Sequence, residues 1–410
     1  MKVLLVNDHG RAYGGAELQV LALRDALRNK GCAVRLLSSN AELLPGFPLV
    51  SDRSCAGRTD LAQVALQSAN PWAWAAMRKE LQSTPPDVVH LRSFLWQLSP
   101  LILPLLRNVP VVLQVPTYKE ICPNGLKIRP DGAPCTVVQG TVCRRSGCIS
   151  TKTHMSAMLQ QKLLMRWQSA IDVTIVLSLQ AKQLFAESGW PDVEVLHNPA
   201  DERGPQSNPA QQPTVSYAGR LSREKGVGFL IDVFARISRE LPEARLQIFG
   251  TGPEEKALRE RAAQTAGRIS FMGHLSADEL DVALAPAWVQ VVPSLWHEPF
   301  GNVSLEAMMR GTAVLGSDTG ALPEVIRHEE TGLIAPPGDA DAWYAALMHL
   351  LSDAKLCRAL GANGRRRAQT HFSRASHTDR IMDFYKLARE QHRDAVEKNQ
   401  RFSNRKLAGG

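Results

Sequence analysis

The chain has 410 residues, of which 44% are hydrophobic and 21% are charged, and its formal net charge is +8. This length exceeds one compact core and allows two domains, while the composition is typical of a soluble globular protein. The positive charge indicates anionic partners, but it does not by itself distinguish nucleic acid, a membrane surface or a phosphorylated substrate.

The sequence shows no sign of export or membrane insertion. Its seven cysteines are an odd number, which argues against a disulfide framework. The first apolar run is short and ends before Asn7 and Asp8, so we expect no signal peptide. No stretch approaches the roughly 20 apolar residues of a membrane span. We therefore expect a cytoplasmic protein, which could lie peripherally at the inner face of the membrane.

The first half of the chain alternates short β-rich runs with amphipathic segments of helix length, and this alternation predicts a parallel α/β sheet. A helix is expected from the glycine pair Gly14 and Gly15 to Gly31. The β-rich runs of this half are 2–7, 33–39, 87–93, 109–115, 172–178 and 193–199.

The segment 201–214 is rich in Pro, Gln, Asn and Ser and has no periodicity, so it is the best linker in the sequence. The alternation then resumes. Strands are expected at 215–219, 244–250, 268–273, 289–293, 312–317 and 331–336. Helices are expected at 227–241, 253–264, 277–284 and 342–351.

This pattern predicts an α/β protein with two Rossmann-like domains that face each other across a cleft. The first domain spans 1–200 and the second 215–373, with the linker 201–214 between them. A long helix at 374–398 is expected to pack back on the first domain, and 399–410 is expected to be a disordered tail. Ligands of such sheets bind beyond the carboxyl ends of the strands.

The loop 7–17 follows the first strand and does not match the GxGxxG fingerprint of dinucleotide sites. Gly14 and Gly15 nevertheless allow backbone N–H groups to approach a ligand at a helix N-terminus, where partial positive charge favours phosphate. A tight turn that happens to contain glycines is the alternative interpretation.

The loop 218–226 follows the first strand of the second domain and carries Arg220 and Lys225. A planar guanidinium and a mobile ammonium form a suitable pair for a diphosphate. Two solvated surface cations are the alternative, but their position after a strand, inside the expected cleft, favours a site.

The segment 297–314 places Glu298 in a loop and Glu306 in the first turns of the helix that follows. A carboxylate accepts two hydroxyl hydrogen bonds at once, so it suits the vicinal hydroxyls of a sugar or ribose. The N–H groups of Gly301–Val303 at the helix start can meet a phosphate or sugar oxygen. Read separately, the two acids could be a surface residue and a helix-stabilising residue.

The order and spacing of these segments resemble the retaining glycosyltransferases of family 4, which have the GT-B fold. Glu298 and Glu306 match the Glu-x7-Glu motif of that family, and Arg220 and Lys225 match its Arg-x4-Lys pair. The GGAE sequence at 14–17 is similar to its donor-phosphate loop. The resemblance covers nearly the whole chain and is strongest from about 215 to 345.

The resemblance implies catalytic roles for Arg220 and Lys225, which would bind the donor diphosphate, and for Glu298, which would hold the hydroxyls of the donor sugar. Glu306 would bind the ribose. Further donor contacts are implied at Gly14, Gly15, Gly250, Gly252, Met272, His274, Leu275, Phe300, Gly301, Asn302 and Val303. The domain 1–200 would bind the acceptor and 215–373 the nucleotide-sugar donor, with a UDP-sugar favoured. No cofactor and no catalytic metal are expected.

One position departs from the family. Pro116 and Thr117 stand where many members have a His-Asp or His-Asn pair whose histidine contacts the donor sugar. Because proline has no side-chain donor and no N–H, that contact is missing or another residue replaces it. Thr117, Tyr118 and His297 are candidates for a contact with the acceptor or sugar. For His90, also a familiar family position, we favour a structural role.

Four cysteines gather in one Gly- and Pro-rich loop: Cys122, Cys135, Cys143 and Cys148. Their spacings are wider than those of common zinc motifs. A structural zinc site, free thiols and a disulfide pair therefore all stay open.

We expect a retaining enzyme that moves a hexose-type sugar from a nucleotide sugar to a hydroxyl of a glycan, glycolipid or natural product. The alternatives are a catalytically weak nucleotide-sugar-binding subunit, a nucleotide-sugar epimerase and a phosphorylase. The basic segment 151–170 and the aromatic segment 71–81 could contact anionic lipid, although two helices covering the sheet are the simpler interpretation. No nucleic-acid-binding motif is present.

Overall fold

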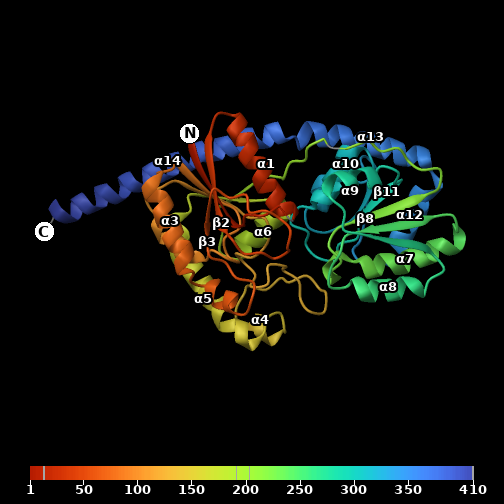
Figure 1. The fold of residues 1–410 in the computed structure, drawn as a ribbon, viewed down its shortest axis with the longest axis horizontal. Helices are drawn as coiled ribbons and strands as arrows, with labels where there is room; N and C mark the ends of the chain where they lie inside the picture. Colours follow the sequence, from red (N-terminus) through yellow and green to blue (C-terminus); the bar gives the residue numbers. More distant parts are fainter. Residues whose placement is uncertain (13, 191, 203, 409–410) are drawn as a thin grey trace.

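A computed structural model describes residues 1–12, 14–190, 192–202 and 204–408, and the side chains among them up to residue 398. It contains two α/β domains, each built on one parallel sheet with helices on both faces, as the alternating pattern predicts (Figure 1). Among the described residues, no helix is both long enough and apolar enough to cross a bilayer.

The N-terminal sheet has seven strands in the order β3-β2-β1-β4-β5-β6-β7. They are β1 (Lys2–His9), β2 (Ala33–Ser39), β3 (Arg53–Cys55), β4 (Val88–Leu91), β5 (Val111–Gln114), β6 (Val173–Val176) and β7 (Val193–Val195). The helices of this domain are α1 (Gly15–Asn29), α2 (Ala62–Leu66), α3 (Pro71–Ser83), α4 (Thr141–Arg145), α5 (Thr151–Trp167) and α6 (Leu179–Glu187), with 3-10 turns η1 (Pro100–Leu106) and η2 (Gln168–Ala170).

The C-terminal sheet has six strands in the order β10-β9-β8-β11-β12-β13. They are β8 (Thr214–Ala218), β9 (Arg245–Phe249), β10 (Arg268–Gly273), β11 (Val289–Val292), β12 (Ala313–Ser317) and β13 (Leu333–Ala335). The helices are η3 (Arg223–Lys225), α7 (Val227–Glu240), α8 (Glu255–Ala263), α9 (Ala277–Leu284), α10 (Asn302–Arg310), α11 (Leu322–Val325), α12 (Ala340–Ser352) and α13 (Ala354–His371).

The strands at the centre of each sheet are buried on both faces, which explains why they appear in the sequence as nearly continuous apolar runs. One face of the N-terminal sheet packs on α3 and η1, and the other packs on α1 and on the last helix. Because all the strands are parallel, the carboxyl ends of each sheet lie at one edge, and the loops that leave them are where a ligand is expected.

The chain crosses between the domains twice. The first crossing precedes the segment 201–213, which contains no helix or strand in its described part. The second precedes α14 (Arg374–Ala408), and Ala200 pairs with Ser373 where the crossings lie side by side. Helix α14 returns to the N-terminal sheet (Figure 1), where Ile381 and Tyr385 join the core beneath α1.

The tail differs from the sequence-based expectation. Disorder is predicted for 399–410, but α14 continues to Ala408 and projects beyond the domain (Figure 1). This stretch has no proline or glycine before Gly409, so nothing in it stops a helix. Residues 409–410 lie outside the described part of the chain.

Candidate functional site

The centre of the candidate site is an ion pair between two loops of the C-terminal domain. Lys225 ends the turn after β8, and Glu298 lies in the loop after β11, the neighbouring strand. The Lys225 ammonium donates to both carboxylate oxygens of Glu298, at 2.9 and 2.8 Å. Sequence positions 73 residues apart are thus brought together because β8 and β11 are adjacent.

Glu298 is held from three sides. Besides Lys225, the hydroxyl of Ser294 donates to its Oε2 at 2.8 Å and the indole N–H of Trp296 donates at 3.0 Å. The side chain is buried, so these charge-assisted bonds fix its orientation. A carboxylate oriented in this way can accept further hydrogen bonds from hydroxyl groups.

The backbone around Glu298 is fixed by Gly320, a residue that follows β12. Gly320 has a φ of +59°, and a Cβ added there would lie 2.2 Å from the carbonyl oxygen of Glu298. The N–H of Ala321 donates to the same oxygen at 2.9 Å. Only glycine allows this close approach, so the two loops position the carboxylate together.

Two helix N-termini meet across the domains beside this pair. Helix α10 begins at Asn302, after Gly301 in the left-handed conformation, and α1 begins at Gly15. A Cβ added at Gly15 would lie 3.6 Å from the side-chain nitrogen of Asn302. The side chain of Asn198 donates to Asn302 at 3.0 Å. The first N–H groups of a helix have no acceptor within the helix and carry positive potential, so both helix starts can bind an anion.

A second contact between the domains occupies the N-terminus of α6. Glu324 of α11 accepts hydrogen bonds from the N–H groups of Leu179 and Gln180 and from the ring of His197. Burial raises the pKa of Glu324, but these hydrogen bonds outweigh burial and lower it overall. The carboxylate therefore acts as a cap for a helix of the opposite domain.

The loop after β5 also reaches the C-terminal domain. Tyr118 is fully buried and meets the ring of Trp296 edge-on, with 6.2 Å between the ring centroids. Farther along the same loop, the carbonyl of Pro130 accepts a hydrogen bond from Arg223 at 2.8 Å. Trp296 in turn donates to Glu298, so the N-terminal domain supports the carboxylate indirectly.

The other predicted diphosphate ligand, Arg220, is exposed in the loop after β8, and its carbonyl accepts a hydrogen bond from the hydroxyl of Tyr217 at 2.8 Å. Within the described part of the chain, its guanidinium makes no hydrogen bond or ion pair and is available to a ligand. Glu306 is partly buried in α10, one turn after Asn302.

Gly250 and Gly252 have a structural reason for lacking a side chain. A Cβ at Gly250 would lie 2.0 Å from the carbonyl oxygen of Gly219, and one at Gly252 would lie 2.3 Å from that of Leu221. The lack of a side chain at these two glycines therefore allows the loop between β9 and α8 to pack against the loop after β8. Access for a ligand at these glycines stays a prediction.

The segment 272–275, which includes the end of β10 and the start of the loop after it, lies at the carboxyl edge of the same sheet. Met272 is 43% exposed, His274 is exposed and Leu275 is partly buried. This placement leaves the segment accessible, although β10 is the outermost strand and no described contact links it to Glu298.

Two of the residues predicted to contact a ligand have buried side chains, so their contacts stay predictions. Phe300 is 2% exposed and packs against the rings of His197 and Phe372, so only its backbone can face a ligand. Tyr118 is 0% exposed, and its hydroxyl has no hydrogen-bond partner among the described residues. Its ring cannot contact an acceptor in this conformation.

The remaining candidates are accessible to different degrees. Thr117, Asn302, Val303 and His297 are partly buried. The ring of His297 is within 3.4 Å of the hydroxyl of Thr319, and burial, followed by the charge of Lys127, lowers its pKa. A neutral imidazole next to Glu298 can exchange hydrogen bonds with a sugar.

Pro116 lies in the loop between β5 and Tyr118 and is partly buried. His90 is buried on the face of the N-terminal sheet that packs on α14, where its Nδ1 is 2.8 Å from the hydroxyl of Tyr385. His90 thus takes part in the packing of α14 and is not part of the cleft.

The cysteine loop gives no support to a zinc site. All seven cysteines are free, and among the described residues no group of three or more His, Cys, Asp or Glu side chains is arranged to hold a metal ion. The sulfur of Cys122 contacts the side chain of Asn124, and that of Cys135 contacts the carbonyl of Val137. Burial, followed by the charges of Cys143, Cys135 and Cys122, raises the pKa of the Cys148 thiol, so the four cysteines of this loop lie near one another.

Several contributors to the site were not predicted from the sequence. Ser294 and Trp296 bind Glu298, Asn198 binds Asn302, and Glu324 caps α6. The contacts of Ser294 and Trp296 with Glu298 could have been inferred from the sequence, because both residues lie just before Glu298. The other contacts join residues more than 100 positions apart, for which the sequence carries no local signal.

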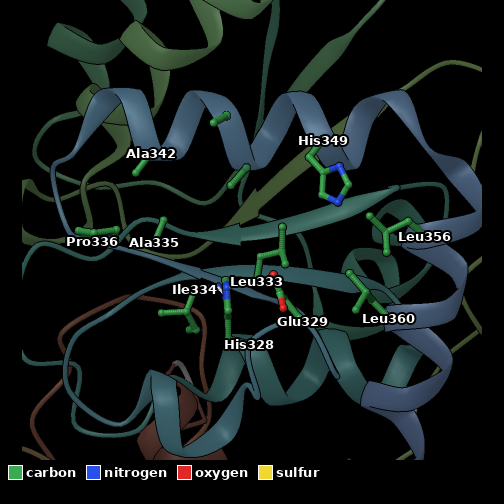
Figure 2. Close-up of a pocket in the computed structure, with 12 residues that line it drawn as sticks. His328, Glu329, Leu333, Ile334, Ala335, Pro336, Ala342, His349, Leu356 and Leu360 are labelled. Atoms are coloured by element: carbon green, nitrogen blue, oxygen red, sulfur yellow. Dashed lines mark hydrogen bonds and ion pairs between the residues drawn. The ribbon is translucent and has the colours of Figure 1, made fainter.

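A pocket of about 460 Å³ lies elsewhere, between the edge strand β13 and α12 (Figure 2). Ile334, His328 and His349 are among its lining residues. None of the residues that surround Glu298 lines it, so this pocket is separate from the candidate site.

Comparison with known proteins places both halves of the chain. The family model described as "Glycosyl transferases group 1" matches residues 200–367, and the model "Glycosyltransferase Family 4" matches residues 13–203. A glycogen synthase of Mycobacterium tuberculosis (strain CDC 1551 / Oshkosh) is 30% identical over 236 residues, which is 55% of each chain. The chain therefore spans about half the length of this relative.

A second relative matches more of the chain. A phosphatidyl-myo-inositol mannosyltransferase of Mycobacterium leprae (strain TN) is 27% identical over 347 residues, covering 82% of this chain and 84% of its own. Among solved structures, Anabaena Alr3699/HepE in complex with UDP and glucose has a TM-score of 0.68 and 17% identity, covering 94% of this chain and 99% of its own. The predicted two-domain GT-B fold is thereby confirmed.

Proposed function

Because this chain belongs to the group 1 glycosyltransferases of family 4, we propose that it is a retaining hexosyltransferase that uses a nucleotide-sugar donor and a hydroxyl acceptor. The observation that carries this proposal is the arrangement at the cleft. The N-termini of α1 and α10 face each other across the domains, and Lys225 and Glu298 lie beside them. Positive potential from a helix start of each domain and the cation Lys225 of the C-terminal domain thus lie close together.

The donor diphosphate would bind among these positive groups. Arg220 and Lys225 provide two cations, and the helix starts at Gly15 and Asn302 provide N–H groups. This fixed positive potential stabilises the charge that develops on a departing nucleoside diphosphate. For that reason we propose a transfer that needs neither a metal nor another cofactor.

Donor binding would also rearrange the ion pair. Lys225 would turn from Glu298 to the diphosphate, and Glu298 would keep its bonds to Ser294 and Trp296 while accepting hydroxyl hydrogen bonds from the sugar. In the transfer itself, the bond from the sugar to the diphosphate breaks while the acceptor oxygen attacks from the same face. The leaving phosphate takes the proton of the acceptor hydroxyl.

Uracil is the base that we propose for the donor nucleotide. The Anabaena protein with the same fold binds UDP and glucose, which supports a UDP-hexose here. Met272, His274 and Leu275, at the carboxyl edge of β10, are the residues that we propose to lie along the base.

The acceptor would be a hydroxyl of a glycan, a lipid-linked sugar or a natural product. The relative named phosphatidyl-myo-inositol mannosyltransferase supports the lipid class. Helix α5 presents Met155 (81% exposed) and Leu159 (48% exposed) between Lys152 and Lys162. An apolar surface with basic neighbours suits the headgroup region of anionic lipid. We therefore propose a cytoplasmic enzyme that can rest on the inner membrane face.

The test is incubation of the full chain with a panel of nucleotide sugars, with release of the nucleoside diphosphate as the readout. Slow hydrolysis of one UDP-hexose, lost in Lys225→Ala and Glu298→Ala proteins that still fold, is the expected result. Binding without turnover would instead support the second candidate, a nucleotide-sugar-binding subunit. Pro116, which offers no donor where many family members have histidine, is the observation that favours this candidate.

A further inference from the structure

A group of polar side chains is buried between the N-terminal sheet and α14, on the face of the sheet that carries α1. His90 lies near the end of β4 and Arg92 just after it, and Gln114 ends β5. His377 belongs to the first turns of α14. These four side chains are at most 5% exposed.

Most of the polar atoms in this group lack a partner within the described part of the chain. Both ring nitrogens of His377, both amide atoms of Gln114 and Nε2 of His90 are buried without a hydrogen bond. The guanidinium of Arg92 likewise makes no hydrogen bond or ion pair there. Buried polar groups are almost always satisfied in folded proteins, and a buried charge without a counter-ion is costlier still.

The charge of Arg92 acts on the rings of His90 and His377, and the Gln114 amide lies near enough to the His90 ring to influence it. Burial, and then the charge of Arg92, lowers the pKa of His377 to about 3 and also lowers the pKa of His90. Burial lowers the pKa of Arg92 only to about 10, so Arg92 stays charged at neutral pH. The group therefore combines one cation with neutral rings and an amide.

The acid whose charge acts on Arg92 is Glu17, and Arg374, the other arginine near this group, is paired with Asp201. Glu17 influences Arg92 electrostatically but makes no ion pair with it, and its carboxylate folds toward Gly14, where an added Cβ would lie 2.6 Å away. Asp201 is bound by Arg374, which contacts it at 2.7–3.1 Å. Arg374 adds a second positive charge near His377.

We propose that this buried group binds a small inorganic anion of the size of chloride. The guanidinium of Arg92, the amide NH₂ of Gln114 and a ring N–H of His377 would donate to it. His90 would add its Nε2–H when the hydroxyl of Tyr385 donates to Nδ1. Water molecules could satisfy the amide and the rings, but only an anion also neutralises the guanidinium.

The position of the anion gives it a mechanical role. Arg374 and His377 follow directly after the second crossing between the domains, where Ser373 pairs with Ala200. An anion shared by His377 and the strand ends of β4 and β5 would fix the start of α14 on the N-terminal domain. This inference is independent of the proposed enzyme activity.

The experiment measures the thermal stability of the full chain at constant ionic strength while chloride or bromide replaces gluconate, which is too large for a buried site. We expect a saturable rise in Tm of about 2 °C or more, because a ligand that binds only the folded state stabilises it. A crystal soaked in bromide should show an anomalous peak among Arg92, Gln114 and His377. Water density at this place, together with a Tm that does not change with the anion, would overturn the proposal.

Two variants assign the effect to this site. Arg92→Met should abolish the dependence of Tm on chloride, and Arg366→Met, an exposed arginine on α13, should retain it. If Arg92→Met does not fold, Gln114→Leu takes its place. This variant should raise the chloride concentration that gives half of the Tm change at least tenfold. An unchanged response in the variant would show that chloride acts elsewhere and would reject the site.

Discussion

The ammonium of Lys225 donates to both carboxylate oxygens of Glu298, so each of these side chains has the other as its charged partner. Two of the three N–H groups of the Lys225 ammonium are thereby occupied, and a diphosphate bound at Lys225, as we propose, would draw on the same donors. Donor binding at Lys225, as we propose it, would weaken an ion pair that is largely buried, so the pair would compete with the donor for Lys225.

The first prediction concerns Glu298→Gln. The neutral amide frees Lys225 and removes a negative charge near the diphosphate, so UDP should bind about tenfold more tightly, a change of about 1.4 kcal/mol. Turnover should fall by about 100-fold or more, because the carboxylate no longer holds the sugar hydroxyls. Calorimetric titration with UDP and a steady-state assay measure the two effects. Glu255→Gln, which removes an acid from an ion pair on α8, is the control.

Weaker UDP binding by Glu298→Gln would contradict this competition. It would mean that Glu298 keeps Lys225 in the orientation that the diphosphate needs, so that the ion pair assists binding.

A second prediction uses two glycines with the same backbone conformation. Gly320 and Gly338 both have positive φ, +59° and +74°. An added Cβ would collide with the backbone of Glu298 at Gly320, but at Gly338 its nearest neighbour would be 3.8 Å away. Gly338→Ala should therefore cost about 1 kcal/mol of stability. Gly320→Ala should cost about 2–4 kcal/mol and should also lower turnover.

Urea denaturation of both variants measures the free energy of unfolding, and an activity assay at low temperature keeps the variants folded. Equal effects of the two substitutions on stability and turnover would show that the Gly320 backbone does not position Glu298.

The third prediction tests the approach of the two helix N-termini. A Cβ at Gly15 would meet Asn302 at an ordinary contact distance, so Gly15→Ala should keep kcat/KM for the donor within about threefold. Gly15→Leu fills the space and should lower kcat/KM at least tenfold, about 1.4 kcal/mol of transition-state stabilisation. Ala16→Leu, at the adjacent exposed position, controls for bulk. If both leucine variants behave alike, the helix starts do not face a common ligand.

The strands and most of the long helices could be predicted from the sequence because glycine, proline and apolar runs mark their ends. The helix predicted at 227–241 is α7 (Val227–Glu240), and the strand predicted at 215–219 is β8 (Thr214–Ala218). The edge strand β3 (Arg53–Cys55) was missed because three residues are too few to show a period. Helix α13 (Ala354–His371) was missed as well. Its polar composition obscures the apolar face that packs on α10.

The site was predictable only where its residues follow strands in motifs. Glu298 and Lys225 belong to such loops, and the order of the sheet brings them together. The burial of Phe300 depends on how a tight turn directs its ring, and the cap that Glu324 provides depends on the docking of the two domains. Neither property is encoded in nearby residues, so both required the structure.

The last prediction concerns Glu120, a buried acid in the loop after β5. Burial, aided by the charge of Asp8 and opposed by a backbone hydrogen bond and by Lys119, raises its pKa from 4.5 to about 8. Because the folded state holds the proton more tightly than the unfolded state, the contribution of Glu120 to stability is complete below pH 4.5. It is lost as the pH rises toward 8, with a slope of up to about 1.4 kcal/mol per pH unit.

Glu120→Gln should remove this slope between pH 4.5 and 8, whereas Glu243→Gln, an exposed acid, should preserve it. Urea denaturation of the three proteins at several pH values measures the free energy of unfolding in each. Lys119 does not affect this pH range. Burial lowers its pKa from 10.5 to about 8, so its own contribution, a gain of stability with rising pH, occurs only from pH 8 to pH 10.5. The same slope in Glu120→Gln as in the unmodified protein would show that Glu120 ionises normally, and that the loop after β5 is open to water.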